Sequence, residues 1–294
     1  MTAEIRIPQL DTPEWDASMA TGGLFDQWHT ACRESHGGGI ADAGDTDLMR
    51  LGFEKMTFLD GEAAEKLRNR IDQIADMPGR LIKTDTDQDK VNESSDKHLF
   101  SLLAKVFHPQ AERRIAHYFG SDFFVHWYLL SRTHPNQAPN VSFLWHRDAG
   151  PPTFLNMMVY LNGTEEHGGG TQFLDMETTK KLAAAGYDYP PVSERLSDLS
   201  DLAGKAGAEY NPVDLSLAPG EGFIFQPTKV LHRGILPTQG TRYVLFLNLM
   251  PSCCPWREGF RRWTMNYMES VAGNWSPNHF AVLAGDDGPT VISA

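Results

Sequence analysis

One short segment of the sequence combines two side chains that can bind a metal ion. His146 and Asp148 stand two positions apart in a tryptophan-histidine-arginine-aspartate segment. On an extended strand, residues i and i+2 project from the same face. An imidazole nitrogen and a carboxylate oxygen would therefore lie side by side. Most such pairs are ordinary surface residues, so this pair alone is weak evidence for a metal site.

Two later residues add to this evidence. His232 lies in an apolar run 84 residues after Asp148 (232 − 148), and Arg242 opens another apolar run ten residues later (242 − 232). A lone histidine in such a run is more often a core residue. Two imidazoles and one carboxylate on one face of a metal, however, bind ferrous iron and leave positions open. A buried guanidinium needs an anionic partner, either a carboxylate of the protein or that of a ligand.

The order His-x-Asp, His and Arg, set in expected strands, resembles the iron(II)- and 2-oxoglutarate-dependent dioxygenases of the phytanoyl-CoA- and prolyl-hydroxylase-like kind. The resemblance covers residues 141–250. It includes the strand at 159–162, the glycine-rich turn at 168–174 and the turn and strand at 217–225. The fold that it implies is a double-stranded β-helix.

The resemblance implies that His146, Asp148 and His232 are the catalytic metal ligands and hold Fe(II). It implies 2-oxoglutarate as co-substrate, O2 as oxidant, and release of succinate and CO2. The expected reaction hydroxylates an unactivated C–H bond of a small molecule, an amino-acid derivative or a natural-product-type metabolite. Desaturation, cyclisation or action on a peptide or protein is the alternative with the same cofactors. Related halogenases lack the carboxylate of Asp148, so halogenation is not expected.

The resemblance also implies a co-substrate site. Arg242 is expected to bind the distal carboxylate of 2-oxoglutarate, with Tyr160 beside it as in prolyl-hydroxylase-like members. Asn156 shares a face with Tyr160 by strand alternation and is expected to line the same cavity. Many relatives have serine or threonine two residues after the arginine, whereas this chain has Val244. A second hydroxyl must then come from Tyr160 or Thr171.

Two other functions remain open. A cupin-like metalloenzyme without co-substrate usually has a third histidine near the first, as His-x-His, where this chain has Asp148. A jelly roll that only binds a ligand would need neither the three metal ligands nor the arginine. Both features favour the dioxygenase.

Strands must position these residues. Short β-branched and aromatic runs, separated by Gly, Pro and Asn, predict eight strands after residue 120. They lie at 123–131, 141–147, 154–161, 170–174, 213–217, 222–226, 230–236 and 242–250. On the strand at 141–147, alternation points Trp145 and Arg147 away from the metal. The predicted fold class is mainly β with helical flanks, a jelly-roll or cupin-like core.

Helical patterns flank this core. Residues 1–120 are expected to be mainly helical, with helices from Asp60 to Met77, after Ser95, and from Pro109 to Gly120. A loop is expected at 79–97, a helical insert at 178–207 and a helix at 256–271. We expect residues 1–294 to form one catalytic domain, with core 121–250 and a C-terminal helix and tail at 251–294.

Composition limits the partners and the compartment. The 294-residue chain has 26 Lys and Arg against 38 Asp and Glu, a net charge of −12. Nucleic acid and anionic membranes need clustered basic residues, so neither is expected as a partner. No apolar run reaches the roughly 18 residues that span a bilayer. Three cysteines and an acidic start favour a cytoplasmic protein. We expect a monomer or homodimer.

Overall fold

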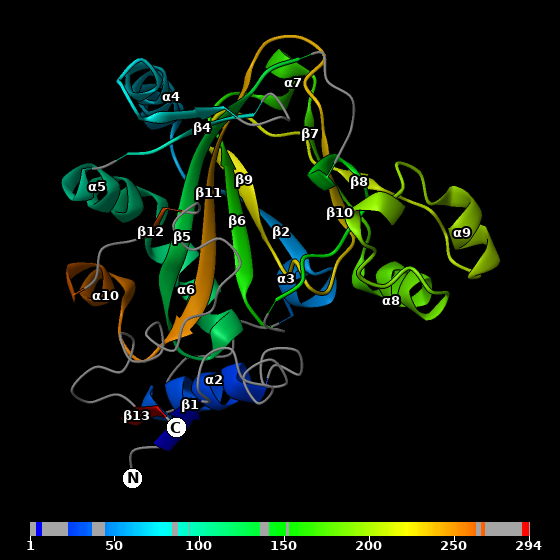
Figure 1. The fold of residues 1–294 in the computed structure, drawn as a ribbon, viewed down its shortest axis with the longest axis horizontal. Helices are drawn as coiled ribbons and strands as arrows, with labels where there is room; N and C mark the ends of the chain where they lie inside the picture. Colours follow the sequence, from blue (N-terminus) through cyan, green and yellow to red (C-terminus); the bar gives the residue numbers. More distant parts are fainter. Residues whose placement is uncertain are drawn as a thin grey trace.

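A large antiparallel sheet is the main element of the structure, a computed structural model that describes residues 4–7, 23–36, 45–83, 88–93, 95–135, 141–150, 153–262, 266–267 and 290–293. Its strands follow the order β2-β9-β6-β11-β5-β4-β3, and β12 lies parallel to β5 (Figure 1). The strands are β2 (Phe53–Thr57), β3 (Leu81–Lys83), β4 (Gln88–Val91), β5 (Asp122–Thr133), β6 (Leu155–Tyr160), β9 (Glu221–Phe225), β11 (Arg242–Ser252) and β12 (Asn266–Tyr267). β11 is central, because it pairs with β5 on one side and β6 on the other.

A smaller antiparallel sheet faces the large one. It has the order β10-β7-β8, with β7 (Gly170–Phe173), β8 (Val213–Asp214) and β10 (His232–Ile235). Aromatic side chains pack between the two sheets. Phe173 of β7 stacks on Phe53 of β2, with ring centroids 4.5 Å apart, and meets Phe223 and Phe225 of β9 edge-on. This buried layer joins the sheets into one core.

Helices cover the outer face of the large sheet (Figure 1). They are α4 (Gly61–Ala75), α5 (Asp96–Val106) and α6 (Pro109–Phe119). Asp60, Ser95 and His108 each accept a hydrogen bond from the first turn of the helix that follows. Gly120 ends α6 with a φ of 65°, a left-handed conformation that glycine adopts without strain.

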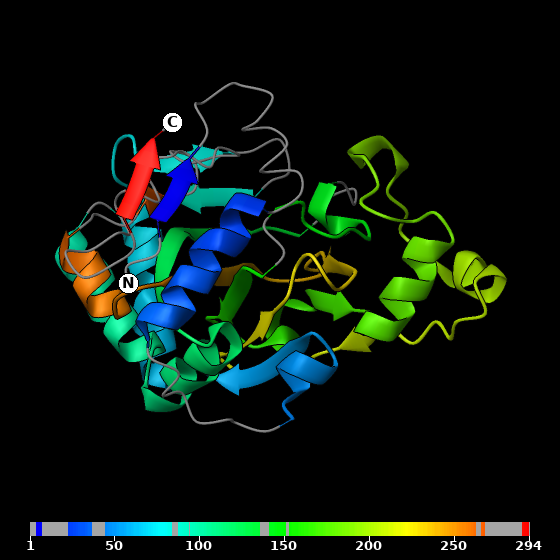
Figure 2. The same ribbon diagram turned by 90° about the horizontal axis from the view of Figure 1, so that it is seen from below.

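The remaining elements lie at the rims. On the far side of the smaller sheet are α8 (Met176–Ala184), α9 (Ser200–Lys205) and the 3-10 helix Val192–Glu194 (Figure 1). α2 (Gly23–Ser35) crosses the end of the large sheet at which β11 terminates (Figures 1 and 2). The others are α3 (Asp47–Arg50), α7 (Thr164–His167), α10 (Trp256–Arg262), and the parallel pair β1 (Glu4–Ile7) and β13 (Thr290–Ser293). No helix in the described ranges is long and apolar enough to cross a membrane.

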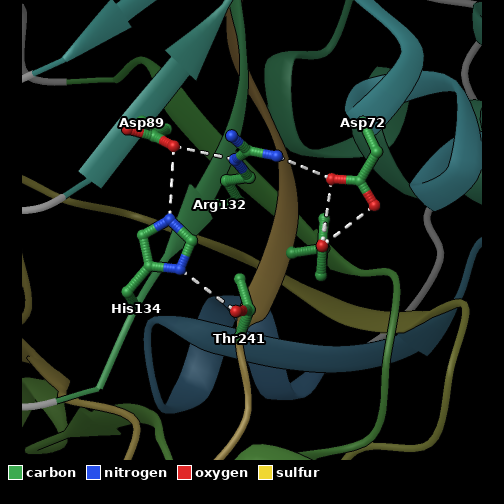
Figure 3. Close-up of polar contacts among 6 residues, drawn as sticks. Asp72, Asp89, Arg132, His134 and Thr241 are labelled. Atoms are coloured by element: carbon green, nitrogen blue, oxygen red, sulfur yellow. Dashed lines mark hydrogen bonds and ion pairs between the residues drawn. The ribbon is translucent and has the colours of Figure 1, made fainter. Parts of the chain in front are cut away.

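A polar network links β5, β4, α4 and β11 (Figure 3). Arg132 of β5 donates to Asp89 of β4 at 2.8 Å and to Asp72 of α4 at 2.9 Å. Tyr243 of β11 donates its hydroxyl proton to Asp72, and His134 bridges Asp89 and Thr241. Two carboxylates therefore share one guanidinium, which links α4 and β4 to β5.

The predicted fold class is confirmed, with corrections in detail. Residues 141–147 do not form a strand: Val141–Phe143 is a 3-10 helix, and only His146 makes a β-bridge, with His232. The backbone there bonds instead to the insert, since the Trp145 amide donates to the Leu196 carbonyl at 2.9 Å. The expected loop at 79–97 contains β3 and β4, and β2 also lies in the part expected to be mainly helical.

The predicted helices at 60–77, after Ser95 and at 109–120 are confirmed, and two helices lie in the expected insert. The expected helix at 256–271 is shorter: α10 ends at Arg262, and residues 266–267 form β12. The other residues of that range lie outside the described part of the chain.

Candidate active site

Three potential metal ligands meet where β10 begins. His146 and His232 exchange backbone hydrogen bonds of 3.0 and 2.9 Å, which sets their side chains next to each other with ring centroids 4.4 Å apart. Asp148 Oδ1 lies 3.4 Å from Nε2 of His146 and 3.7 Å from Nε2 of His232. One ligand atom from each residue lies within 4.8 Å of the others, so a single ion could contact all three.

Backbone carbonyls orient both imidazole rings. Nδ1 of His146 is 2.7 Å from the Leu144 carbonyl, and Nδ1 of His232 is 3.0 Å from the Val230 carbonyl. A carbonyl can only accept, so each Nδ1 carries a proton and each ring turns its Nε2 toward Asp148. Burial and the neighbouring His146 lower the pKa of His232 to about 4, which keeps this ring neutral, as a metal ligand must be.

Two asparagines hold the carboxylate. Asn156 Nδ2 donates to Oδ2 of Asp148 at 3.0 Å, and Asn248 Nδ2 donates to Oδ1 of Asn156 at 2.8 Å. Burial raises the pKa of Asp148, but His232 and His146 outweigh this and hold it below its usual value. The site therefore offers two imidazole nitrogens and one ionised carboxylate, a donor set that suits ferrous iron with open positions.

A buried cation lies farther along the same sheet. Arg242, 5% exposed, donates to the carbonyls of Gly170 at 3.1 Å and Ile235 at 3.2 Å, and approaches Oγ1 of Thr133 at 3.5 Å. Its Nε is buried without a hydrogen-bond partner, and no carboxylate of the described residues forms an ion pair with it. A buried guanidinium whose partners are all neutral is suited to an anionic ligand.

Polar side chains surround this cation. The hydroxyls of Tyr160 and Thr171 are 2.9 Å apart, and the ring of Tyr160 stacks on that of His167 at 6.0 Å. The Gly169 amide donates to Nδ1 of His167 at 3.0 Å. Burial and the charge of Arg242 lower the pKa of His167 to about 4, so the imidazole adds no second positive charge. One uncompensated cation and two hydroxyls thus share one end of the core.

The structure groups the predicted residues in two sets. It brings His146, Asp148 and His232 together, and Tyr160 and Thr171 together near Arg242. Asn156 lies with Asp148 rather than with Tyr160, because it is four residues from Tyr160 on β6, about 13 Å along the strand.

The neighbours of the ligands point away, as predicted. Trp145 is buried among Leu174, Leu182 and Leu231 on the side of the insert, and Arg147 pairs with Asp188. The sequence does not distinguish His167 or Thr133 from other polar residues, whereas strand alternation places Asn248 on the face of Arg242, where it could equally touch a ligand or pack in the core. The polar break at Asn248 in the apolar run of β11, on the face of Arg242, was the signal available for it.

Neither a family model nor a curated protein matches the sequence. Solved structures do match the fold. EctD from S. alaskensis with bound Fe aligns at a TM-score of 0.51 and 13% identity, over 71% of this chain and 77% of EctD. The epimerase SnoN in complex with Fe3+, alpha ketoglutarate and nogalamycin RO aligns at 0.49 and 13%, over 70% and 81% of the two chains. HygX from Streptomyces hygroscopicus with nickel, 2-oxoglutarate and hygromycin B aligns at 0.46 and 11%, over 71% and 86%.

The alignment with EctD covers more than two thirds of both chains, at an identity that speaks for the fold alone. It agrees with two facing antiparallel sheets that carry a His-Asp-His cluster at their edge. The chain therefore has the fold of EctD.

Proposed function

We propose that this protein is an iron(II)- and 2-oxoglutarate-dependent dioxygenase that hydroxylates a small molecule. The observation that carries the proposal is the convergence of His146, Asp148 and His232, with both Nε2 atoms and one carboxylate oxygen close to one another. The buried Arg242, which lacks a carboxylate partner among the described residues, is the second support. EctD, the structure with the same fold, was solved with bound Fe.

Each residue has a definite task in this proposal. His146, Asp148 and His232 hold Fe(II), which would supply the activation of O2. Arg242 binds the distal carboxylate of 2-oxoglutarate through charge-assisted hydrogen bonds, and the hydroxyls of Tyr160 and Thr171 complete that site.

The protein also orders and shields the centre. Asn156 keeps Asp148 in one orientation, and Asn248 supports Asn156. The rings of Phe173 and Phe225 pack at 6.4 and 4.9 Å from His232 and exclude water on that side. Iron supplies the difficult chemistry, while these residues contribute position and a dry wall.

The insert indicates the substrate class. Arg195 donates to the carbonyls of Val141 at 3.0 Å and Pro190 at 3.4 Å, and it forms no ion pair with the described residues. Burial lowers the pKa of Arg195 while the charge of Asp148 raises it, so the guanidinium lies within electrostatic reach of Asp148. We propose that it binds a carboxylate of the substrate, which favours an amino-acid derivative. A carboxylic acid should then stimulate turnover more than its methyl ester, and Arg195→Gln should remove that preference.

The proposed function is tested by measuring succinate released from 2-oxoglutarate by the full chain with Fe(II) and O2. Succinate should form with the wild type, depend on added iron, and disappear in Asp148→Ala. Iron binding without any 2-oxoglutarate turnover, across a panel of carboxylic acids, would favour a cupin enzyme or a ligand-binding protein instead. Gain of one oxygen atom by the substrate identifies hydroxylation, and loss of two hydrogen atoms identifies desaturation or ring closure.

Domain organisation, compartment, oligomeric state and partners complete the proposal. We propose one catalytic domain over residues 1–294, acting in the cytoplasm as a monomer or homodimer, without a nucleic-acid or membrane partner.

A further inference from the structure

Two cysteines far apart in the sequence touch in the fold. Cys32 is on α2, and Cys253 follows the last residue of β11; their Sγ atoms are 3.4 Å apart. Cys32 is fully buried, whereas Cys253 is partly exposed to solvent. The third cysteine, Cys254, is also buried, with Sγ 3.6 Å from the Ser252 hydroxyl. Neither Cys32 nor Cys253 takes part in the proposed dioxygenase site.

We propose that Cys32 and Cys253 form a redox modification site, in which a peroxide oxidises Cys253 and Cys32 then closes a reversible disulfide. Two thiols in contact need only a small displacement to reach the length of a disulfide bond, about 2 Å. A pair with one sulfur open to solvent and the other buried behind it has the arrangement of an attacking and a resolving cysteine.

The surroundings assign the two roles. The hydrogen bond from the Cys32 thiol lowers the pKa of Cys253, a hydrogen bond from Ser35 lowers it further, and burial opposes both. Burial raises the pKa of Cys32. Cys253 therefore carries more thiolate, the reactive form, and it is also the sulfur that a small oxidant can reach.

The reaction balances with one peroxide. The Cys253 thiolate attacks a peroxide oxygen and breaks the O–O bond; with hydrogen peroxide this leaves a sulfenic acid and, after protonation, one water. The Cys32 sulfur then attacks the sulfur of the sulfenic acid and displaces hydroxide, which takes the Cys32 proton and leaves as a second water. Two thiols are oxidised to one disulfide, and one peroxide is reduced to two waters.

The disulfide would clamp α2 to the end of the large sheet at which β11 terminates (Figures 1 and 2). α2 already packs there: Trp28 donates to the Pro251 carbonyl at 3.0 Å, and Phe25 contacts Phe154 and Met250. Phe154 and Met250 are two residues from Asn156 and Asn248, which hold Asp148. The covalent link would therefore join the helix to the strand ends that support the proposed metal site.

The test treats the folded full chain with hydrogen peroxide and measures intact mass, free thiols and thermal unfolding. The wild type should lose two hydrogen atoms, fall from three free thiols to one, and unfold at a temperature about 5 °C higher. A reductant should reverse all three changes. Cys254→Ser, the matched control, should still form the disulfide. Addition of oxygen atoms without a bridge, or a bridge that needs Cys254, would overturn the proposal.

The order of events is tested with single variants and dimedone, which traps sulfenic acid. Cys32→Ser should accumulate a dimedone adduct at Cys253, because the resolving sulfur is missing. Cys253→Ser should leave Cys32 as a free thiol, since burial protects it. An adduct on Cys32 in that variant, or equal rates of oxidation in both variants, would contradict the assigned roles. These readouts require neither iron nor turnover, so they remain informative if the proposed dioxygenase activity is not found.

Discussion

Arg242 and Asp148 are the two side chains whose charge most needs an external partner. Oδ1 of Asp148 faces two imidazoles, and its Oδ2 accepts a hydrogen bond from Asn156. Arg242 is surrounded by carbonyl and hydroxyl oxygens. A divalent cation at the first site and a carboxylate at the second would satisfy both charges, so these residues give the most direct mutational tests.

Replacing Arg242 should weaken the binding of 2-oxoglutarate specifically. A charge-assisted, bidentate contact is worth a few kcal/mol, so Arg242→Gln should raise the KM for 2-oxoglutarate by about 100-fold. Iron affinity should stay unchanged, because Arg242 contacts no metal ligand. Arg68→Gln on α4, whose arginine pairs with Glu166, is the control. An unchanged KM in Arg242→Gln would contradict the role given to the guanidinium.

Asn156 should influence the metal without touching it. Asn156→Ala releases Oδ2 of Asp148 and removes the partner of Asn248, so we expect iron affinity to fall by roughly 10- to 100-fold. Asn162 is a matched control, since it is equally buried but bonds to the backbone of Thr241 and Tyr243. Asn162→Ala should lower stability and leave iron affinity unchanged. Equal losses of affinity in both variants would assign Asn156 to structure alone.

His167 should make stability depend on pH. Its pKa is about 4 in the fold against 6.5 for a free histidine, so between these values the unfolded chain binds more protons. The free energy of unfolding should therefore fall as pH drops from 6.5 to 4, by up to about 3 kcal/mol from this residue. Urea unfolding at several pH values should show a shallower fall in His167→Gln. The exposed His98→Gln is the control, and identical profiles in all three proteins would refute this assignment.

Helices α4, α5 and α6 could be predicted from the sequence, whereas strands β2, β3 and β4 could not. Helices α4, α5 and α6 have an apolar stripe and a capping residue, and both signals are local. β2, β3 and β4 are short: β2 pairs with β9 and β4 with β5, strands far away in sequence, and β3 is held at the sheet edge by β4. The segment before His146 has a strand-like composition, but the Trp145 amide donates to the Leu196 carbonyl of the insert instead of a neighbouring strand. Long-range pairing of this kind has no local signature.

Arg132 should hold two of these elements in place. Arg132→Met leaves Asp72 and Asp89 without their shared guanidinium (Figure 3). Because Arg132 is partly exposed, we expect the free energy of unfolding at pH 7 to fall by about 2 kcal/mol, less than for a fully buried pair. Urea unfolding measures this change. Arg50→Met, which breaks an exposed pair with Asp47, should have little effect. Equal effects would mean that the network contributes no more than a surface ion pair.

At the scale of the whole molecule, the clustering of the three candidate metal ligands could be predicted from the sequence, whereas the pairing of several strands could not. The order of His146, Asp148, His232 and Arg242 in the sequence was enough to predict that the first three lie together. The supporting residues carry no such pattern. Asn156, Asn248 and His167 acquire their partners only when β6, β11 and α7 pack together. Candidate ligands can thus be predicted from the sequence, whereas the residues that orient them are found only in the structure.

The roles proposed for Asn156 and Arg242 depend on the candidate metal centre. If His146, Asp148 and His232 hold one ion, Asn156 supports a ligand and Arg242 faces a co-substrate. If they do not, both are ordinary buried polar residues.

The most direct test is anaerobic equilibrium dialysis of the metal-free chain against Fe(II), with iron measured per chain. The wild type should bind one iron per chain, and His146→Ala, Asp148→Ala and His232→Ala should each lose tight binding while remaining folded by circular dichroism. His108→Ala, which removes a histidine outside the cluster, should bind like the wild type. A wild type that takes up no iron, or triad variants that retain one tightly bound iron, would contradict the account.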